Sequence, residues 1–474
     1  MSTRPNDSNS VVQNNTQSSG PEEPSIKEVL AYGSPALGDS LVSHMLGGFA
    51  TSMLVVSLEL NAAYISLIIG AKMAIDAVTD PLMGHISDNW RGRLGRRRPF
   101  ILAGGLLVGI FLFFTWNLPV GWSKDHVTLY FAGGVVAYSI FHTIFMVPYT
   151  ALGIELSPTY DGKTRVYLWK TLFSRTSTFI NPWLYPLCLS SLFVSEYQGA
   201  KYVAAGVAVL VALGCVAAFQ NCQERSHFKA AKKEPIISSI KKTFKNPHFL
   251  RIVGLYVLMM VTIQLFIQVG AIINIQYVFG GDKLAGASYT AGVETLAGVL
   301  VLLTLPVVGK LCKRLGKHNA LKIAFCLMII GDIIKWWAFT PEYKMLQWVY
   351  PFCYSLGISS IFVILESMMA DAVDYDEYLT GFRREGIYGA VGGFIMKNAG
   401  AGAGALSGIL LVMAGYQSDL GHEQSDSTFI WLRLFNSIIP AAMLLCGLAL
   451  LYKYPLTRDV MDKVRQEVQA RKTK

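Results

Sequence analysis

Two aspartates four residues apart lie inside a long apolar stretch of this sequence. They are Asp76 and Asp80, in the segment AKMAIDAVTDPLMGHISD at 71–88. Residues at i and i+4 share one face of a helix, and each ionised side chain near the centre of a bilayer costs roughly 2.5–3.5 kcal/mol. Together they would cost about 5–7 kcal/mol, which is comparable with the whole stability of a typical domain. A positive partner is therefore expected beside them.

The chemistry of the pair points to a cation. Two carboxylates with a nearby hydroxyl group suit a hard metal ion, because such ions prefer oxygen ligands. Two like charges this close also disfavour full ionisation, so a proton is the other candidate. The alternative is structural: an ion pair that only locks helices together. We favour cation binding for Asp76 and Asp80, and the structural interpretation for Asp332 and Lys335, which lie three residues apart. Other ionisable residues at membrane depth are Asp39, Lys72, Lys170, Arg175, Glu294, Glu366 and Lys397.

The composition assigns these residues to a membrane protein. Hydrophobic residues make up 53% of the 474 residues and charged residues only 15%, whereas a soluble domain carries about 25% charged residues. Apolar stretches long enough to span a bilayer occur near 36–58, 62–86, 99–119, 127–152, 166–195, 200–220, 249–279, 287–308, 319–340, 346–369, 387–414 and 428–452. The expected fold is an all-α membrane protein with twelve transmembrane helices.

The sequence divides into two similar halves. A polar segment at 221–248 separates two bundles of six predicted helices, at 27–220 and 249–453. The motif PLMG at 81–84 has a counterpart in PVVG at 306–309, and a Tyr-Asp pair occurs in the loop expected after helix 4 and again in the loop expected after helix 10. Such six-helix pseudo-repeats are typical of secondary transporters, whose site lies between the halves.

Lysine and arginine residues are concentrated on one side of this topology. They occur at 91–98, 225–245 and 310–317 and in the basic tail at 454–474, so the positive-inside rule predicts that both termini are cytoplasmic and that the chain lies in the inner (plasma) membrane. Residues 1–26 are polar and typical of a disordered tail. Topology explains the net charge of +10. We therefore expect the lipid bilayer, and no nucleic acid, as a partner.

The loop after helix 2 resembles the signature of the major facilitator superfamily. The sequence GHISDNWRGRLGRRR contains Gly84, Asp88 and Arg96. Glycine would allow close helix approach, and the charges would pair across the cytoplasmic mouth to hold one conformation. Asp161 and Asp376, in the two Tyr-Asp pairs, are assigned to the same gating group. The alternative is a solvated basic loop that only sets topology.

Several segments resemble the glycoside-pentoside-hexuronide:cation symporter family, to which the melibiose carrier belongs. IDAVTDP is similar to its helix 2 signature, TIFMVP to its helix 4 motif and REGIYGAVGGFIMK to its helix 11 motif. The resemblance implies that Asp76, Asp80, Thr143 and Lys397 form the cation site, with the first three as metal ligands if the coupling ion is Na⁺. Asp39, at the end of YGSPALGD, would contact the sugar.

The substrate pocket departs from that family pattern. Met146 and Thr150 replace an aspartate and a tryptophan that contact sugar in the melibiose carrier, and Lys170 falls near the family's helix 5 arginine. We assign Asp39, Lys170, Thr150, Gln264, Gln268 and Trp169 to substrate binding. Lys170 suits an anionic sugar such as a hexuronide. Alternatively, these polar groups form hydrogen bonds between helices.

We therefore predict a secondary active transporter that couples a sugar to Na⁺ or H⁺ by alternating access. No cofactor is expected apart from the coupling cation. Transport of a lipid or another amphiphile is the alternative. An intramembrane enzyme is less favoured, because paired catalytic aspartates must come from facing helices and no metalloprotease, nucleophile-elbow or P-loop motif occurs.

Overall fold

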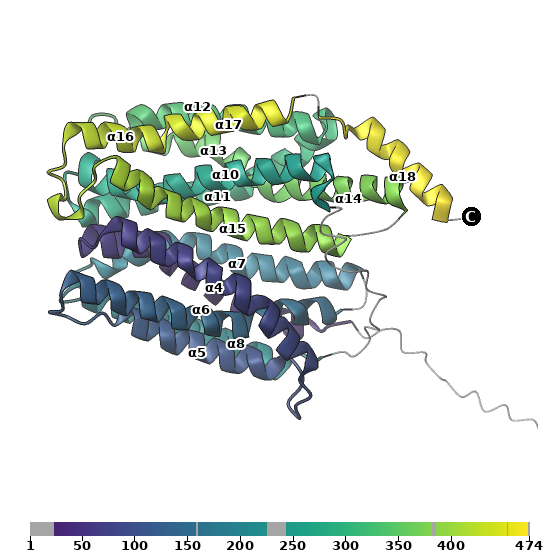
Figure 1. Cartoon of the computed structure of the whole chain (residues 1–474), viewed down its shortest axis with the longest axis horizontal. Coiled ribbons are helices and arrows are strands. Elements are labelled where there is room, and N and C mark those ends of the chain that lie inside the picture. The colour runs from purple at the N-terminus through teal and green to yellow at the C-terminus, as the bar shows by residue number, and fades with distance from the viewer. Residues whose placement is uncertain (1–22, 158–159, 225–242, 382–384, 453, 473–474) are drawn as a thin grey trace, which may run out of the picture.

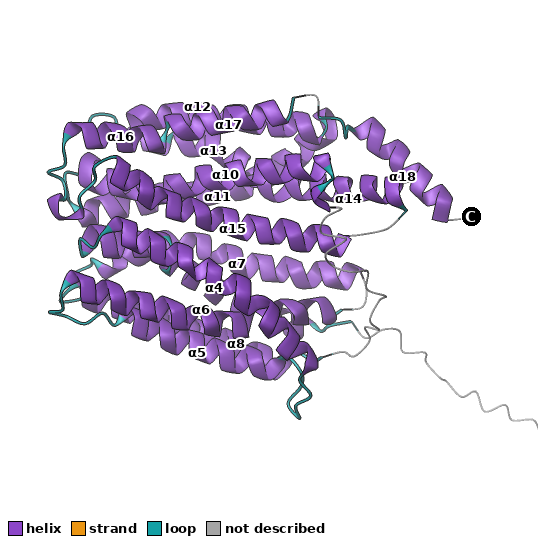
Figure 2. Ribbon diagram, viewed as in Figure 1, coloured by secondary structure: helices purple, strands orange, loops and turns teal. Residues whose placement is uncertain are grey.

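The computed structural model describes residues 23–157, 160–224, 243–381, 385–452 and 454–472. Within these ranges the fold is helical (Figure 2). The described residues form one isolated β-bridge, between Gly92 and Gly95. Most of the predicted tail at 1–26 and of the predicted linker at 221–248 lies outside the described residues. The all-α prediction is confirmed.

The N-terminal half begins with a broken helix. Ser25 accepts a hydrogen bond from the backbone N–H of Glu28 and so caps α1, which starts ten residues before the first predicted span. The elements of this half are α1 (Ile26–Gly33), α2 (Pro35–Met45), α3 (Gly48–Ala50), the π-helical η1 (Thr51–Ser57), α4 (Ala62–Asn89), α5 (Arg98–Trp116), α6 (Lys124–Glu155), α7 (Tyr160–Cys188) and α8 (Glu196–Asn221).

The C-terminal half repeats this layout. Its elements are α10 (Pro247–Ile273), η2 (Asn274–Val278), α11 (Lys283–Leu315), α12 (Lys317–Ala338), η3 (Lys344–Trp348), α13 (Tyr350–Ser360), η4 (Ile361–Leu365), α14 (Glu366–Thr380), α15 (Glu385–Met413), η5 (Ser418–Leu420), α16 (Asp426–Asn436), α17 (Ile438–Leu450) and α18 (Arg458–Lys472). The two halves lie one above the other in Figure 1.

Several boundaries differ from the sequence-based expectation. Both Tyr-Asp pairs were predicted to lie in loops and are helical: Tyr160 and Asp161 begin α7, and Tyr375 and Asp376 lie inside α14, which continues to a left-handed Gly381. Asp88 belongs to α4 and not to the loop that follows it. Polar residues extend α4 and α14 beyond the apolar stretch, since a helix continues past the membrane until a capping residue ends it.

Ten helical segments of the described chain are long and apolar enough to cross a membrane. The two other predicted spans correspond to α7 and α12, which have 29 and 22 residues but carry charged residues within their length, such as Lys170 in α7 and Asp332 in α12. Both pack against other helices, α7 against α1, α2 and α11, and α12 against α13 and α17. Their charges lower the hydropathy without preventing a buried position in the bundle.

The two ends of the bundle differ in charge. We call the end that holds the 90–97 loop, α14 and α18 the basic end, on the right in Figure 1, and the other the opposite end. At the opposite end, Lys124 of the N-terminal half forms ion pairs with Glu59 of its own half (3.2 Å) and with Asp419 of the other half. The Ser418 hydroxyl also donates to the Leu60 carbonyl at 2.9 Å. Direct polar contacts therefore join the halves at this end.

Candidate functional site

Helix α4 turns its two aspartates away from the outer surface of the bundle. Leu67, Val78 and Leu82 form an exposed face, with 58–65% of each side chain accessible. Asp76 is only 1% exposed, and Asp80 is partly buried. Since α4 packs against α6, Asp80 meets a hydroxyl-bearing residue of that helix.

The two aspartates have different partners. Lys72 Nζ lies 3.0 Å from Asp76 Oδ2, one turn earlier on the same helix. Thr143 of α6 instead donates from its hydroxyl to Asp80 Oδ1 at 3.0 Å. The predicted grouping of Thr143 with an α4 carboxylate is thus present at Asp80, whereas a lysine balances the charge of Asp76. The side chain of Lys397 lies outside the described residues.

A further threonine, which the sequence analysis missed, completes a cluster of oxygen atoms. The hydroxyl oxygens of Thr79 and Thr143 lie 2.9 Å apart, and Thr79 also donates to the Ile75 carbonyl at 2.9 Å. Three O···O contacts link four oxygen atoms here, but the two hydroxyls supply only two hydrogens. One contact therefore brings lone pairs together, which is favourable when a cation lies among them.

This cluster differs from an acidic metal centre. No group of three or more His, Cys, Asp or Glu side chains suited to a metal occurs among the described residues. The donor set around Asp80 consists of one carboxylate and two hydroxyls, with a backbone carbonyl beside them. Such oxygens suit a weakly held monovalent cation, whereas tightly bound transition metals favour imidazole and thiolate ligands.

The sequence analysis also missed His142, whose ring nitrogen contacts the carboxylate of Asp39. His142 Nε2 lies 2.8 Å from Asp39 Oδ1, and the His142 ring stacks on Tyr138 with centroids 5.2 Å apart. Asp39 is 22% exposed and His142 13%. Histidine at membrane depth indicates a functional site, as lysine, arginine, aspartate and glutamate do, so His142 could have been recognised from the sequence.

Lys170 lies close to Asp39 in space. Its Nζ is 5.2 Å from the centroid of the Tyr149 ring and 5.8 Å from that of Tyr167, and it interacts electrostatically with Asp39. Trp169, its neighbour in the chain, packs against the core of the bundle. A positive charge over aromatic faces beside a histidine-bound carboxylate is a suitable arrangement for a polar ligand.

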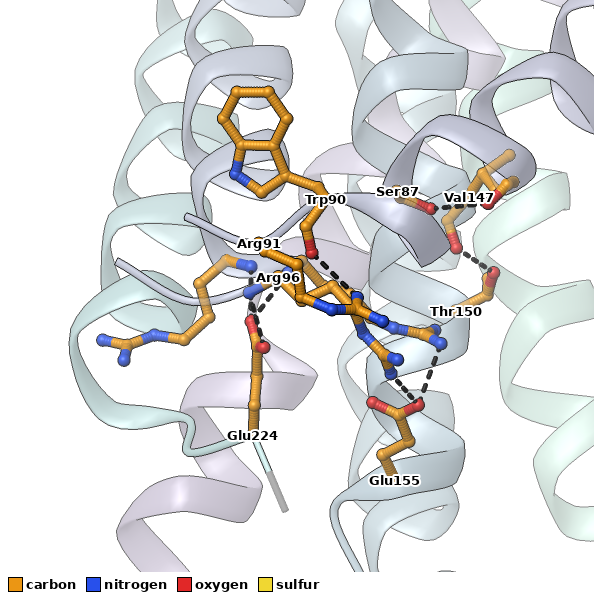
Figure 3. Close-up of polar contacts among 11 residues, drawn as sticks. Ser87, Trp90, Arg91, Arg96, Val147, Thr150, Glu155 and Glu224 are labelled. Carbon is orange, nitrogen blue, oxygen red and sulfur yellow. Dashed lines mark hydrogen bonds and ion pairs between the residues drawn. The ribbon is translucent and has the colours of Figure 1, made fainter. Parts of the chain in front are cut away.

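The other predicted substrate residues have hydrogen bonds within the protein. Thr150 is exposed, and its hydroxyl donates to two carbonyls of its own helix, at Met146 (3.0 Å) and at Val147 (3.0 Å; Figure 3). Gln268 is buried, and its Oε1 accepts hydrogen bonds from Ser407 (2.7 Å) and Thr51 (3.5 Å).

Gln268 therefore joins η1 of one half to α10 and α15 of the other, as the structural alternative expects. Gln264 is partly buried one turn earlier on α10, at the i−4 position where it shares a helix face with Gln268. Their assignment to the substrate remains a prediction.

The basic loop is folded onto its own half by two acids that the sequence analysis did not single out (Figure 3). Backbone N–H groups of Arg96 and Arg97 donate to Glu224 at 2.7 Å each, and both side chains pair with Glu155, Arg97 at 2.9 Å. At Gly95, where φ is +106°, a Cβ atom would lie 2.7 Å from Glu224 Oε1. This loop therefore has a defined conformation, and its gating role stays a prediction.

The remaining predicted gating residues are Gly84, Asp88, Asp161 and Asp376. A Cβ atom at Gly84 would lie 3.8 Å from Val147, an ordinary contact, so packing does not require glycine in this conformation. Asp376 is buried on α14, 6% exposed. The side chains of Asp88 and Asp161 lie outside the described residues.

Comparisons with known proteins identify the family of this chain. A family model described as MFS/sugar transport protein matches residues 31–458. Similar curated proteins include an uncharacterized symporter of Synechocystis sp. (24% identity, 93% of this chain and 96% of the relative). A glucuronide carrier protein homolog of Escherichia coli is 22% identical (84% and 85%), and an isoprimeverose transporter of Lactiplantibacillus pentosus is 26% identical (86% and 85%).

Solved structures share the fold at lower identity. A bacterial homolog of the human lysosomal transporter Spinster, solved in an inward-facing, unoccupied conformation, has a TM-score of 0.66 at 12% identity and covers 94% of this chain and 98% of its own. The nucleoside transporter NupG has a TM-score of 0.61 at 13% identity, with 91% and 100% covered. The predicted superfamily is confirmed, and with it a transporter rather than an enzyme: the chain belongs to the MFS/sugar transport protein family.

Proposed function

We propose that this protein is a symporter that couples a sugar to a monovalent cation, with the cation held at Asp80. The observation that carries the proposal is the oxygen cluster of Asp80, Thr143 and Thr79 at membrane depth. Relatives named as a glycoside/cation symporter and as an isoprimeverose transporter support the cargo class.

The two carboxylates differ in their described partners. Lys72 pairs with Asp76 at 3.0 Å, whereas the Thr143 hydroxyl donates to Asp80 at 3.0 Å. A Na⁺ or H⁺ bound at Asp80 would offset the charge of that carboxylate, which lowers the free energy of enclosing it between the halves. Binding of the cation and of the sugar would therefore favour the same closed state, and each would raise the affinity for the other.

Lys170 favours an anionic sugar as the cargo. It lies beside the Asp39–His142 pair, and a carboxylated sugar placed against its Nζ would gain a charge-assisted hydrogen bond. A relative is named as a glucuronide carrier protein homolog. We propose a uronic acid or its glycoside, with Asp39 accepting hydrogen bonds from sugar hydroxyls.

The membrane orientation follows from the distribution of charge. The basic end carries the 90–97 loop and α18, so we propose that it faces the cytoplasm of the inner membrane. The contacts of Lys124 and Ser418 then close the far side, and alternating access breaks them while the halves rock about the site.

Counterflow in proteoliposomes tests the function. The reconstituted chain would be given radiolabelled uronates, neutral glycosides and pentoses at fixed pH, with and without Na⁺. Uptake of at least one sugar supports symport if Na⁺ raises it, or if a proton gradient imposed in a parallel assay raises it. Absence of uptake for the whole panel contradicts a sugar cargo, and uptake that neither cation affects contradicts coupling.

A further inference from the structure

A cavity between the two halves contains ionisable residues that neither the cation site nor the substrate site uses. Its volume is about 280 Å³, and its walls come mainly from α2 and α7 of one half and α10 and α11 of the other. The lining is largely apolar, with four strongly polar residues: His44, Arg175, Asn181 and Glu294. A smaller cavity of about 50 Å³ also reaches His44, Asn181 and Glu294.

Glu294 is the acidic member of this group. It lies eleven residues into α11 from Lys283, or about 16 Å from the opposite end at 1.5 Å per residue. It forms no hydrogen bond or ion pair with the residues that the structure describes, and Arg175, although it lines the same cavity, does not pair with it. The carboxyl group therefore faces the cavity at membrane depth.

The surroundings of Glu294 contain few charges. The ionisable groups that face it from the packed elements are His44 on α2, Arg175 and Tyr185 on α7, and Tyr350 on α13. The wall from α10 is apolar. Behind Tyr350, on α12, Lys335 is already paired with Asp332 at 2.9 Å.

Two polar groups in the cavity lack the partners that burial requires. An ionised carboxylate in hydrocarbon surroundings is strongly unfavourable and takes up a proton instead. Asn181 Oδ1 is buried and has no hydrogen-bond partner within the described ranges, although buried acceptors normally have one. A proton on the carboxyl removes the cost of its charge, and the amide oxygen of Asn181 could be satisfied by a single bound water.

We propose that Glu294 binds a proton, separately from the cation at Asp80, and keeps it while the opposite end is closed. Half of the cavity wall belongs to the other bundle, so separation of the halves at the opposite end admits water. The carboxylic acid then transfers its proton to that water, leaving a carboxylate and a hydronium ion. Closure reverses the step, because the ionised form is unfavourable in apolar surroundings that are cut off from bulk water. Closing the opposite end is thus proton-dependent.

Infrared spectroscopy of the purified chain in lipid tests the protonation state directly. The C=O stretch of a protonated carboxyl in apolar surroundings is expected in the wild type at neutral pH and lost in Glu294→Gln. Glu59→Gln, at a carboxyl whose side chain is 46% exposed, is the matched control and should keep it. Glu294→Asp should retain a shifted band, which guards against loss of folding. Identical spectra for wild type and both Glu294 variants would overturn the proposal.

Counterflow at equal pH on both sides provides the functional readout. A step that needs one proton changes in rate by at most about tenfold per pH unit, so wild-type exchange should slow at alkaline pH. In Glu294→Gln, which mimics the protonated acid, the pH dependence should become shallower by one proton, while the dependence on the coupling cation at Asp80 remains. An unchanged pH profile would contradict the proposal. The infrared result needs no cargo, so it stands or falls independently of sugar symport.

Discussion

Each half of the molecule contains a lysine–aspartate pair at membrane depth, and the two pairs differ in how completely they are enclosed. In the C-terminal half, Asp332 and Lys335 are both fully buried, 2.9 Å apart. Tyr354 donates to Asp332 at 2.8 Å, and Lys335 Nζ lies 3.8 Å from the centroid of the Tyr354 ring.

In the N-terminal half, Lys72 is 16% exposed, and a second carboxylate, Asp80, lies one turn beyond the pair. The same residue types therefore serve two purposes. Where the chain supplies both charges and encloses them, the pair joins helices. Where a second carboxylate lies beside hydroxyl oxygens, we propose that the site takes a mobile cation.

The largest effect is expected from Asp332→Ala. Removal of one partner leaves Lys335 charged and fully buried, which costs about 3–5 kcal/mol. Thermal unfolding of the detergent-solubilised protein should show a strongly lowered Tm. The double variant Asp332→Leu with Lys335→Met should recover most of that loss, and a double variant as unstable as the single one would show that the pair contributes more than mutual neutralisation.

The next effect is expected from Asp80→Asn, and it should be functional. The amide keeps the size of the side chain and removes the carboxylate proposed to bind the cation, so accumulation of sugar against a gradient should be abolished while the Tm stays near that of the wild type. Accumulation assays and unfolding curves check both halves of this prediction. Full accumulation in Asp80→Asn would place the coupling cation elsewhere.

Asp76→Asn should lower both the stability of the protein and its cation coupling. Lys72 would lose its partner at 3.0 Å while keeping partial access to water, so the loss of stability should be smaller than for Asp332→Ala, about 1–3 kcal/mol. Coupling should also weaken, because Lys72 would then compete with the cation for Asp80. A variant with wild-type Tm and cation dependence would show that the Lys72–Asp76 pair is dispensable.

Thr143→Val should have a milder effect on the same site. Loss of the hydroxyl that donates to Asp80 at 3.0 Å should lower the apparent cation affinity about 10–100-fold, the range found for groups that orient metal ligands. Thr143→Ser is the matched control and should stay near the wild type. Equal cation affinities for valine and serine would remove Thr143 from the site.

The smallest effect is expected at the opposite end, with Asp419→Asn. The pair with Lys124 is exposed, 51% and 74% for the two side chains, and such pairs contribute about 0–1 kcal/mol. Stability should hardly change, but the closed opposite end should be less populated. Labels across that end, on the 117–123 and 421–425 loops, would report a longer mean distance, whereas an unchanged distance would show that apolar packing alone closes it.

The sequence was sufficient for the features that depend on spacing along one helix. Asp76 and Asp80 lie together because i and i+4 share a face, and apolar length indicated the spans and the two halves. It was not sufficient where partners come from different helices. Thr79, Glu155 and Glu224 became recognisable only when α4 met α6 and when the loop at 90–97 folded onto the ends of α6 and α8. The partner of His142, Asp39, comes from α2.

What the sequence by itself determined is the placement of charges in an apolar chain, because the cost of an ion in hydrocarbon depends on residue type and depth. Only the tertiary structure decided which partner each carboxylate has. It paired Asp76 with Lys72, gave Asp80 to Thr143, and left Glu294 facing a cavity. The physical reason is that electrostatic and hydrogen-bond energies act over a few ångströms, and those distances are set by helix packing.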